Sequence, residues 1–322
     1  MDMRRLGHSD IEVSSLSLGT VALGMAYGIT PKDEQAQGGT GGMRPPTLAE
    51  ATRLVHQAIA GGINHIDTAR GYGDAEQVLG HALKGKRAEV VLTTKASCFG
   101  PDGTVLRGEA LRQQVEQSLT TSLGLLGTDH VDVLMLHSAP VEVFADGEAM
   151  EILKQFKSRG LTRLVGASTY GTEAPQQAIA QGAEVLQVAF NILDQTLVDE
   201  VLPLAAAQGV GMVIRSVYLK GALTPRAEDL PVHLAPLKAQ ARAVAAYGAG
   251  LQPPVRLAEL ALRFVLSHPL LSTALIGVRN EAELAVALAA ASQPALPPEV
   301  MDRLAAFRWD SPLLNPGVWE LP

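Results

Sequence analysis

The sequence predicts an α/β fold, a closed (β/α)8 TIM barrel, and three observations support this prediction. Eight short apolar runs alternate with helix-length stretches along almost the whole chain. No long hydrophilic linker interrupts the 322 residues, and a barrel of this length is commonly one domain. Aromatic residues make up only 4% of the chain, which suits layers of parallel strands and helices better than an all-β sandwich. We therefore expect one domain spanning residues 1–322.

The strands are expected where the apolar runs are too short for helices. In chain order these runs are residues 16–18, 63–66, 90–93, 131–136, 163–165, 185–189, 212–214 and 274–276. Both faces of a parallel barrel strand are covered, so the runs need no alternation of polar and apolar residues. The alternative is an open doubly wound sheet, which is less favoured because no Gly-rich fingerprint follows the first strand.

Helices are expected between the strands, where apolar side chains recur at helical spacing. Residues 47–60 and 108–123 each keep their apolar side chains on one face. Gly61 and Gly62 follow the first of these helices, and Gly160 ends a later one. Glycine favours such ends because it readily takes the left-handed conformation that closes a helix.

Three segments fall outside this repeat. Residues 4–13 are expected to form a hairpin that closes the barrel floor. The long loop at residues 24–46 and the tail at residues 308–322 are expected near the active-site face, since long loops after barrel strands are usually functional. Two readings of Trp309 and Trp319 in the tail stay open: their rings cover the barrel mouth, or they pin the tail to the helices.

Composition and charge exclude several function classes. The net charge of −7 and the pI near 5.6 argue against nucleic acid or an anionic membrane as a partner. A single cysteine, Cys98, excludes an internal disulfide and a thiolate metal cluster. We see no secretory signal, and no apolar run approaches the roughly 20 residues that cross a bilayer. We expect a cytoplasmic protein with no nucleic-acid or membrane partner, and its oligomeric state stays open.

Four polar residues at or beyond the C-terminal ends of three successive strands are candidates for catalysis, because barrel active sites lie at that face. Asp67 ends the second strand, Tyr72 lies in the loop beyond it, Lys95 ends the third strand and His137 the fourth. These four residue types together form a chemically coherent set.

A phenol with an ordinary pKa of about 10 is a poor acid near neutral pH. We expect the Lys95 ammonium to lower the pKa of Tyr72, and the Asp67 carboxylate to hold that ammonium in place. His137 can then share a hydrogen bond with the substrate oxygen while Tyr72 acts as general acid or base. No side chain delivers a hydride, so a cofactor must. The set predicts an oxidoreductase for a small-molecule carbonyl or alcohol substrate.

These motifs identify the chain, from about Leu6 to Leu288, as similar to the aldo-keto reductase superfamily. The resemblance rests on GINHIDTA at 62–69 with Tyr72 beyond it, VLTTK at 91–95, VDVLMLH at 131–137 and VGAST at 165–169. It implies a (β/α)8 barrel and catalytic roles for Asp67, Tyr72, Lys95 and His137. It also implies that Ser168, Thr169 and Gln187 hold the nicotinamide carboxamide.

The resemblance also implies residues for the rest of the cofactor. The segment at 215–221 resembles the family's pyrophosphate loop, which gives Arg215, Ser216, Leu219 and Lys220. The segment at 277–283 resembles its adenosine-phosphate element, which gives Gly277, Arg279 and Glu283. In that element Arg279 would meet the 2′-phosphate of NADP, while Glu283 stands where glutamine is common. NADP is therefore the expected cofactor, with NAD as the alternative.

Two other interpretations of the sequence exist, a metal site and a non-catalytic role. His65 and Asp67 share one face of a strand, as metal ligands do, but no second histidine pair completes a site, so no metal is expected. A non-catalytic redox sensor or regulatory subunit that binds nicotinamide is the alternative function. The presence of all four chemical residues favours the enzyme. The substrate and the direction of the reaction stay open.

Overall fold

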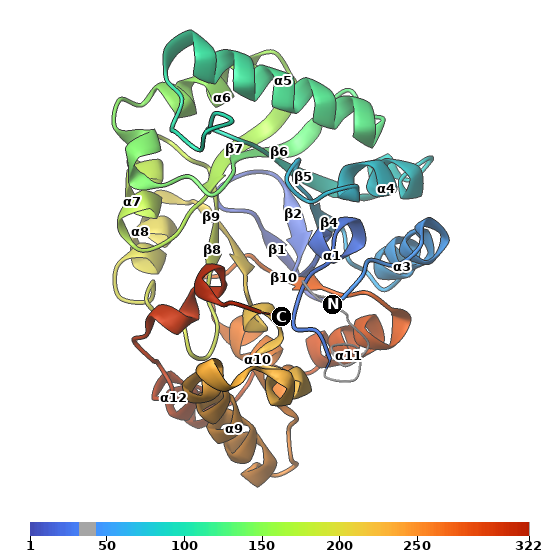
Figure 1. Cartoon of the computed structure of the whole chain (residues 1–322), viewed down its shortest axis with the longest axis vertical. Coiled ribbons are helices and arrows are strands. Elements are labelled where there is room, and N and C mark those ends of the chain that lie inside the picture. The colour runs from blue at the N-terminus through green and yellow to red at the C-terminus, as the bar shows by residue number, and fades with distance from the viewer. Residues whose placement is uncertain (32–42, 322) are drawn as a thin grey trace.

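The computed structural model describes residues 1–31 and 43–321, and eight parallel strands among them close into a barrel (Figure 1). The strands are β3 (Leu16–Gly19), β4 (His65–Asp67), β5 (Val91–Ala96), β6 (Val131–Leu136), β7 (Thr162–Ser168), β8 (Val185–Ala189), β9 (Gly211–Arg215) and β10 (Thr273–Gly277). Each strand pairs with the next along the chain, and β10 pairs with β3 to close the ring. The predicted barrel is confirmed, and every predicted run overlaps one of these strands.

Several strands extend further toward their C-terminal ends than the apolar runs predict. β4 continues to Asp67, β5 runs past Lys95, and β7 runs to Ser168. The backbone ladder does not depend on the side chain, so a strand continues through polar residues that face the barrel mouth. The apolar runs alone therefore fall short, whereas the strand end expected at Asp67 agrees with the structure, and β5 runs one residue past the end expected at Lys95.

Helices surround the strands, as Figure 1 shows. They are α1 (Val21–Gly24), α3 (Leu48–Ala60), α4 (Ala75–Ala82), α5 (Gly108–Leu126), α6 (Glu148–Ser158), α7 (Glu173–Ala180), α8 (Val201–Gln208), α9 (Ala235–Gly250), α10 (Leu257–Ser267), α11 (Glu281–Ala291) and α12 (Pro298–Ala305). The expected helix at 47–60 begins one residue later, because Thr47 is its N-cap and forms a capping box with Glu50. Among the described helices, none is both long and apolar enough to cross a membrane.

An N-terminal hairpin closes the barrel floor. β1 (Met3–Arg5) pairs antiparallel with β2 (Glu12–Ser14). Leu6, Ile11 and Val13 are buried in a cluster with inward-facing residues of the barrel strands. Gly7 in the turn has φ +65°, and a Cβ there would overlap the Gly209 carbonyl oxygen, so only glycine fits. The hairpin prediction is confirmed.

The C-terminal tail lies against the loop that follows β8. The Trp309 backbone N–H donates to the Leu193 carbonyl oxygen at 2.9 Å. Trp319 is only 6% exposed, and its indole N–H donates to the Leu313 carbonyl oxygen at 2.9 Å. In Figure 1 the last residues run in toward the middle of the view. The burial of Trp319 favours the reading in which this ring pins the tail to the barrel.

Candidate active site

A cavity of about 860 Å³ lies where the C-terminal ends of the barrel strands meet. Most of the predicted site residues line it: Asp67, Tyr72, His137, Gln187, Arg215, Ser216, Lys220, Gly277, Arg279 and Glu283. The others, Lys95, Ser168, Thr169 and Leu219, are buried behind the wall. The loop at residues 24–46 adds Tyr27, Gly28, Ile29 and Met43, while its residues 32–42 lie outside the described part of the chain. The volume is in the range of small-molecule and cofactor sites.

Lys95 is the centre of a buried polar network. Its Nζ donates to both carboxylate oxygens of Asp67 at 2.7 Å and to the Thr68 carbonyl oxygen at 3.0 Å. The side-chain amide of Gln187 donates to Asp67 at 2.7 Å. Burial lowers the pKa of Lys95, but Asp67 and Tyr72 outweigh burial and raise it above its usual value. Lys95 therefore stays charged although it is only 1% exposed.

The Tyr72 hydroxyl lies 3.4 Å from Lys95 Nζ, so the pKa of Tyr72 depends on this ammonium as well as on burial. Burial raises the pKa of Tyr72, Lys95 lowers it, and the net direction is upward. Lys95 therefore acts in the predicted direction, but burial outweighs it. Lys95 makes shorter bonds to both oxygens of Asp67, so the carboxylate screens much of its charge from the more distant phenol.

His137 follows β6 and presents its ring edge-on to Tyr72, with ring centroids 5.6 Å apart. Burial, reinforced by the nearby Lys95 charge, lowers the pKa of His137 to about 4. The ring is therefore neutral near pH 7 and carries one N–H donor and one acceptor. Neither ring nitrogen has a hydrogen-bond partner in the described parts of the chain, so both are available to a ligand oxygen.

An ion pair between the half-buried Arg70 and the buried Glu76 braces the loop that carries Tyr72. The Glu76 carboxylate, fully buried in the first turn of α4, accepts from Arg70 at 2.6 Å and from the Thr94 hydroxyl at 2.6 Å. Arg70 precedes Tyr72, and Thr94 is the neighbour of Lys95 on β5. The pair thus ties the Tyr72 loop to the strand of its partner. The sequence patterns gave Glu76 no role, although an acidic residue just past the catalytic loop was an available signal.

The loop after β9 has an unusual backbone. Ser216, Leu219 and Lys220 all have positive φ, at 61°, 45° and 55°. Residues other than glycine rarely adopt this conformation, and turned backbone of this kind aims N–H groups into concavities that bind anions. The loop therefore suits the diphosphate that the resemblance assigns to it.

Arg279 is paired rather than free. Its guanidinium donates to Glu283 at 2.6 Å, and its backbone N–H donates to the same carboxylate at 3.0 Å. Arg226 lies 3.8 Å from Glu283 on the cavity wall. Sequence position suggests that Arg279 begins the last barrel helix, but α11 begins two residues later, at Glu281, with Asn280 as its N-cap. The four-residue spacing of Arg279 and Glu283 was a signal for the pair.

The three residues assigned to the carboxamide differ in how they are exposed. Gln187 lines the cavity, and its donation to Asp67 leaves its amide oxygen able to accept. Ser168 and Thr169 do not line the cavity. The Thr169 hydroxyl is buried and lacks a hydrogen-bond partner among the described residues. Such an orphaned group beside the wall is consistent with a polar ligand that supplies its partner.

His65 and Cys98 both lie in surroundings that give them a structural role. The ring nitrogens of His65 each lie 2.8 Å from a hydroxyl oxygen, one of Ser17 and one of Thr93. Burial lowers the pKa of His65 to about 4, so this ring is a neutral member of the barrel core. Burial raises the pKa of Cys98 to about 11, which makes its thiol unreactive near neutral pH.

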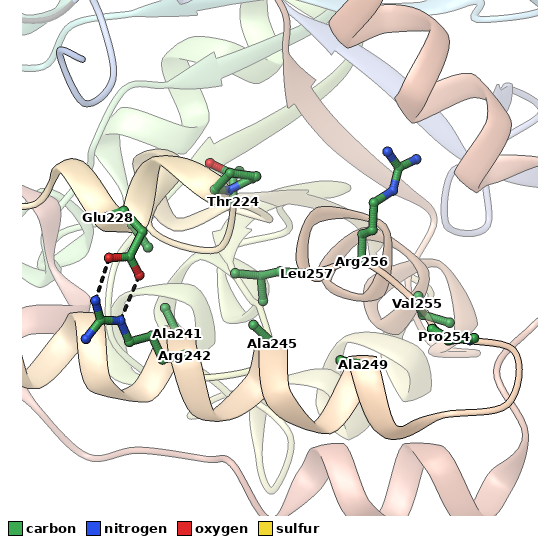
Figure 2. Close-up of a pocket in the computed structure, with 12 residues that line it drawn as sticks. Thr224, Glu228, Ala241, Arg242, Ala245, Ala249, Pro254, Val255, Arg256 and Leu257 are labelled. Carbon is green, nitrogen blue, oxygen red and sulfur yellow. Dashed lines mark hydrogen bonds and ion pairs between the residues drawn. The ribbon is translucent and has the colours of Figure 1, made fainter. Parts of the chain in front are cut away.

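A second cavity of about 380 Å³ lies beside α9 (Figure 2). Its lining is mostly apolar, and Figure 2 shows an ion pair of Glu228 and Arg242 at its edge. Arg256 and Leu257 line both cavities. None of the predicted site residues lines the smaller cavity, so the candidate chemistry belongs to the larger one.

Comparisons with known proteins agree with this geometry. A model described as the aldo/keto reductase family matches residues 16–308. The NADH-specific methylglyoxal reductase of Escherichia coli (strain K12) is 30% identical over 68% of this chain and 68% of its own. The aldo-keto reductase YhdN of Bacillus subtilis (strain 168) is 27% identical over 88% of this chain and 87% of its own. The holo structure of an aldo-keto reductase from Bacillus halodurans superposes with a TM-score of 0.77, at 25% identity over 96% of both chains. The chain belongs to the aldo/keto reductase family, whose members are in general NAD(P)-dependent oxidoreductases.

Proposed function

We propose that this protein is an NADP-preferring aldo-keto reductase that acts on a small aldehyde, ketone or sugar. The observation that carries the proposal is the contact of Tyr72 with the buried Asp67–Lys95 pair, beside the neutral His137 ring. When bound, the nicotinamide supplies the hydride or, in the reverse direction, accepts it. The residues of the chain handle the proton and the charge on the substrate oxygen.

Tyr72 is the proposed general acid. Its raised pKa keeps the hydroxyl protonated near neutral pH, which carbonyl reduction requires. As the proton leaves, Lys95 stabilises the phenolate that forms, and Asp67 keeps the ammonium in place. His137 donates a hydrogen bond to the same substrate oxygen. Alcohol oxidation needs the phenolate at the start, so a raised pKa favours reduction near pH 7 and moves oxidation to higher pH.

The proposed cofactor contacts run from β7 to α11. Ser168, Thr169 and Gln187 hold the carboxamide, and the loop at residues 216–221 holds the diphosphate. Arg279 binds the 2′-phosphate of NADP through charge-assisted hydrogen bonds. The Glu283 carboxylate competes for the same guanidinium, which weakens the preference and keeps NAD as the alternative. The Escherichia coli relative named as NADH-specific points to the same alternative.

The test is a substrate panel of aldehydes, ketones and aldoses, run in both directions with NADP and NAD in parallel. Absorbance of the reduced nicotinamide reports turnover, and fluorescence titration reports binding of each cofactor. Reduction of simple aldehydes with NADPH at neutral pH is the expected result. Binding of cofactor without turnover of any compound would instead support a redox sensor on the same barrel. We further propose that the whole chain acts as one domain, in the cytoplasm.

A further inference from the structure

Arg215 ends β9 and faces the cavity that Tyr72 and His137 also line. Its guanidinium carbon lies 4.0 Å from the centre of the Tyr170 ring. One terminal nitrogen donates to the Thr169 carbonyl oxygen at 2.9 Å, and the other to the Ser216 hydroxyl at 3.4 Å. Stacking on a ring and two donated bonds hold the guanidinium in one orientation.

The charge of Arg215 has no carboxylate within 4.0 Å in the parts of the chain that the structure describes. Arg279, in the same cavity, is by contrast paired with Glu283. Among several influences on the pKa of Tyr72 and of His137, the Arg215 charge acts downward on both, so its field reaches the reacting groups.

The guanidinium also keeps hydrogen-bonding capacity. It has five N–H groups, of which two donate to Thr169 and Ser216. The remaining N–H groups, on Nε and on both terminal nitrogens, have no partner among the described residues. A planar fork of unused donors matches a carboxylate, which accepts two parallel bonds.

We propose that Arg215, which the resemblance places in the cofactor loop, instead binds an anionic group of the substrate, so that the preferred substrates are small carbonyl compounds that carry a carboxylate. This rests on the proposed function, because the carbonyl of such a compound must be the group reduced beside Tyr72. Arg215 is a preoriented cation with no carboxylate within ion-pair distance among the described residues, although its charge also acts on Asp194. In a protein of net charge −7, such a cation attracts anions that the overall charge would otherwise repel. Arg215 then determines specificity and leaves the proton transfer to Tyr72.

The experiment compares meta- and para-formylbenzoate with the corresponding formylbenzamides, which match them in size and lack the charge. The ratio of kcat/KM for acid over amide is measured at saturating cofactor in the native protein and in Arg215→Gln. The matched control is Arg256→Gln, which removes another cation from the same cavity; Figure 2 shows Arg256 extending away from α9. Calorimetric titration of the same compounds, with NADP present, measures their binding independently of turnover.

We expect Arg215→Gln to lower the acid-over-amide ratio, and the relative affinity for the acid, by about 10- to 100-fold. The control should keep the native ratio. The native preference should also weaken as salt is raised, because screening acts on the charged compound alone. Equal losses on acid and amide, with weaker cofactor binding, would assign Arg215 to the cofactor and overturn the inference. Turnover of neither compound by the native protein would contradict the proposed function, while calorimetry would still decide the role of Arg215.

Discussion

Replacing Lys95 with methionine is the perturbation whose consequences the structure defines best. The change keeps a similar volume and removes the charge that pairs with Asp67. Asp67 is only 2% exposed and would keep a single side-chain donor, Gln187. Leaving one partner of a buried ion pair uncompensated costs about 3–5 kcal/mol. The double variant Asp67→Asn with Lys95→Met removes both charges and should recover most of that stability.

Urea unfolding at neutral pH measures the free energy of unfolding of the three proteins, and the pH–rate profile measures the effect on Tyr72. Lys95 acts to lower the pKa of Tyr72, so its removal raises that pKa further. The rate of carbonyl reduction falls at alkaline pH as Tyr72 loses its proton. In Lys95→Met the alkaline limb of the pH–rate profile should therefore move to higher pH, and turnover should fall. A single variant as stable as the native protein, or an unmoved alkaline limb, would refute this reasoning.

Three further predictions concern acid stability, cofactor choice and the tail. The pKa of His65 is about 4 in the folded state and 6.5 in the unfolded state, so the unfolded state binds more protons between these two pH values. The free energy of unfolding should therefore fall by about 3 kcal/mol as the pH drops from 6.5 to 4. In urea unfolding, the free energy of unfolding of His65→Asn should depend less steeply on pH than that of the native protein. The same slope in both proteins would exclude His65 as the cause of the acid destabilisation. Fluorescence titration should show that Arg279→Ala weakens NADP binding far more than NAD binding. Glu283→Gln should strengthen NADP binding. If each variant changes the affinity for both cofactors equally, Arg279 and Glu283 do not recognise the 2′-phosphate. Trp319→Ala should cost up to about 3 kcal/mol in unfolding free energy and leave KM unchanged for large and small aldehydes alike, because this ring pins the tail and no described tail residue lines the cavity. A selective change in KM for large aldehydes would instead place the tail at the pocket.

The sequence predicts the barrel, and the strand ends that carry the candidate catalytic residues, because both depend on local patterns. Apolar runs mark the strands, and Asp67, Lys95 and His137 stand at or just after their ends. The pKa of Tyr72 was not predictable, since it depends on burial and on how the Lys95 charge is shared with Asp67. The stacking of Arg215 on Tyr170 likewise joins side chains from β9 and the end of β7, which spacing along the chain does not reveal.

Replacing Tyr72 with phenylalanine tests whether Tyr72 is the proton donor of a nicotinamide-dependent carbonyl reductase. The measurement is kcat for NADPH-dependent aldehyde reduction, taken with the dissociation constant for NADPH in the same protein. Tyr27→Phe is the matched control, since it removes another phenolic hydroxyl from the cavity wall and keeps the ring. We expect a loss of about 10²–10⁴-fold in kcat for Tyr72→Phe alone, with the dissociation constant for NADPH unchanged. Near-native turnover by Tyr72→Phe would contradict the role of Tyr72 as proton donor.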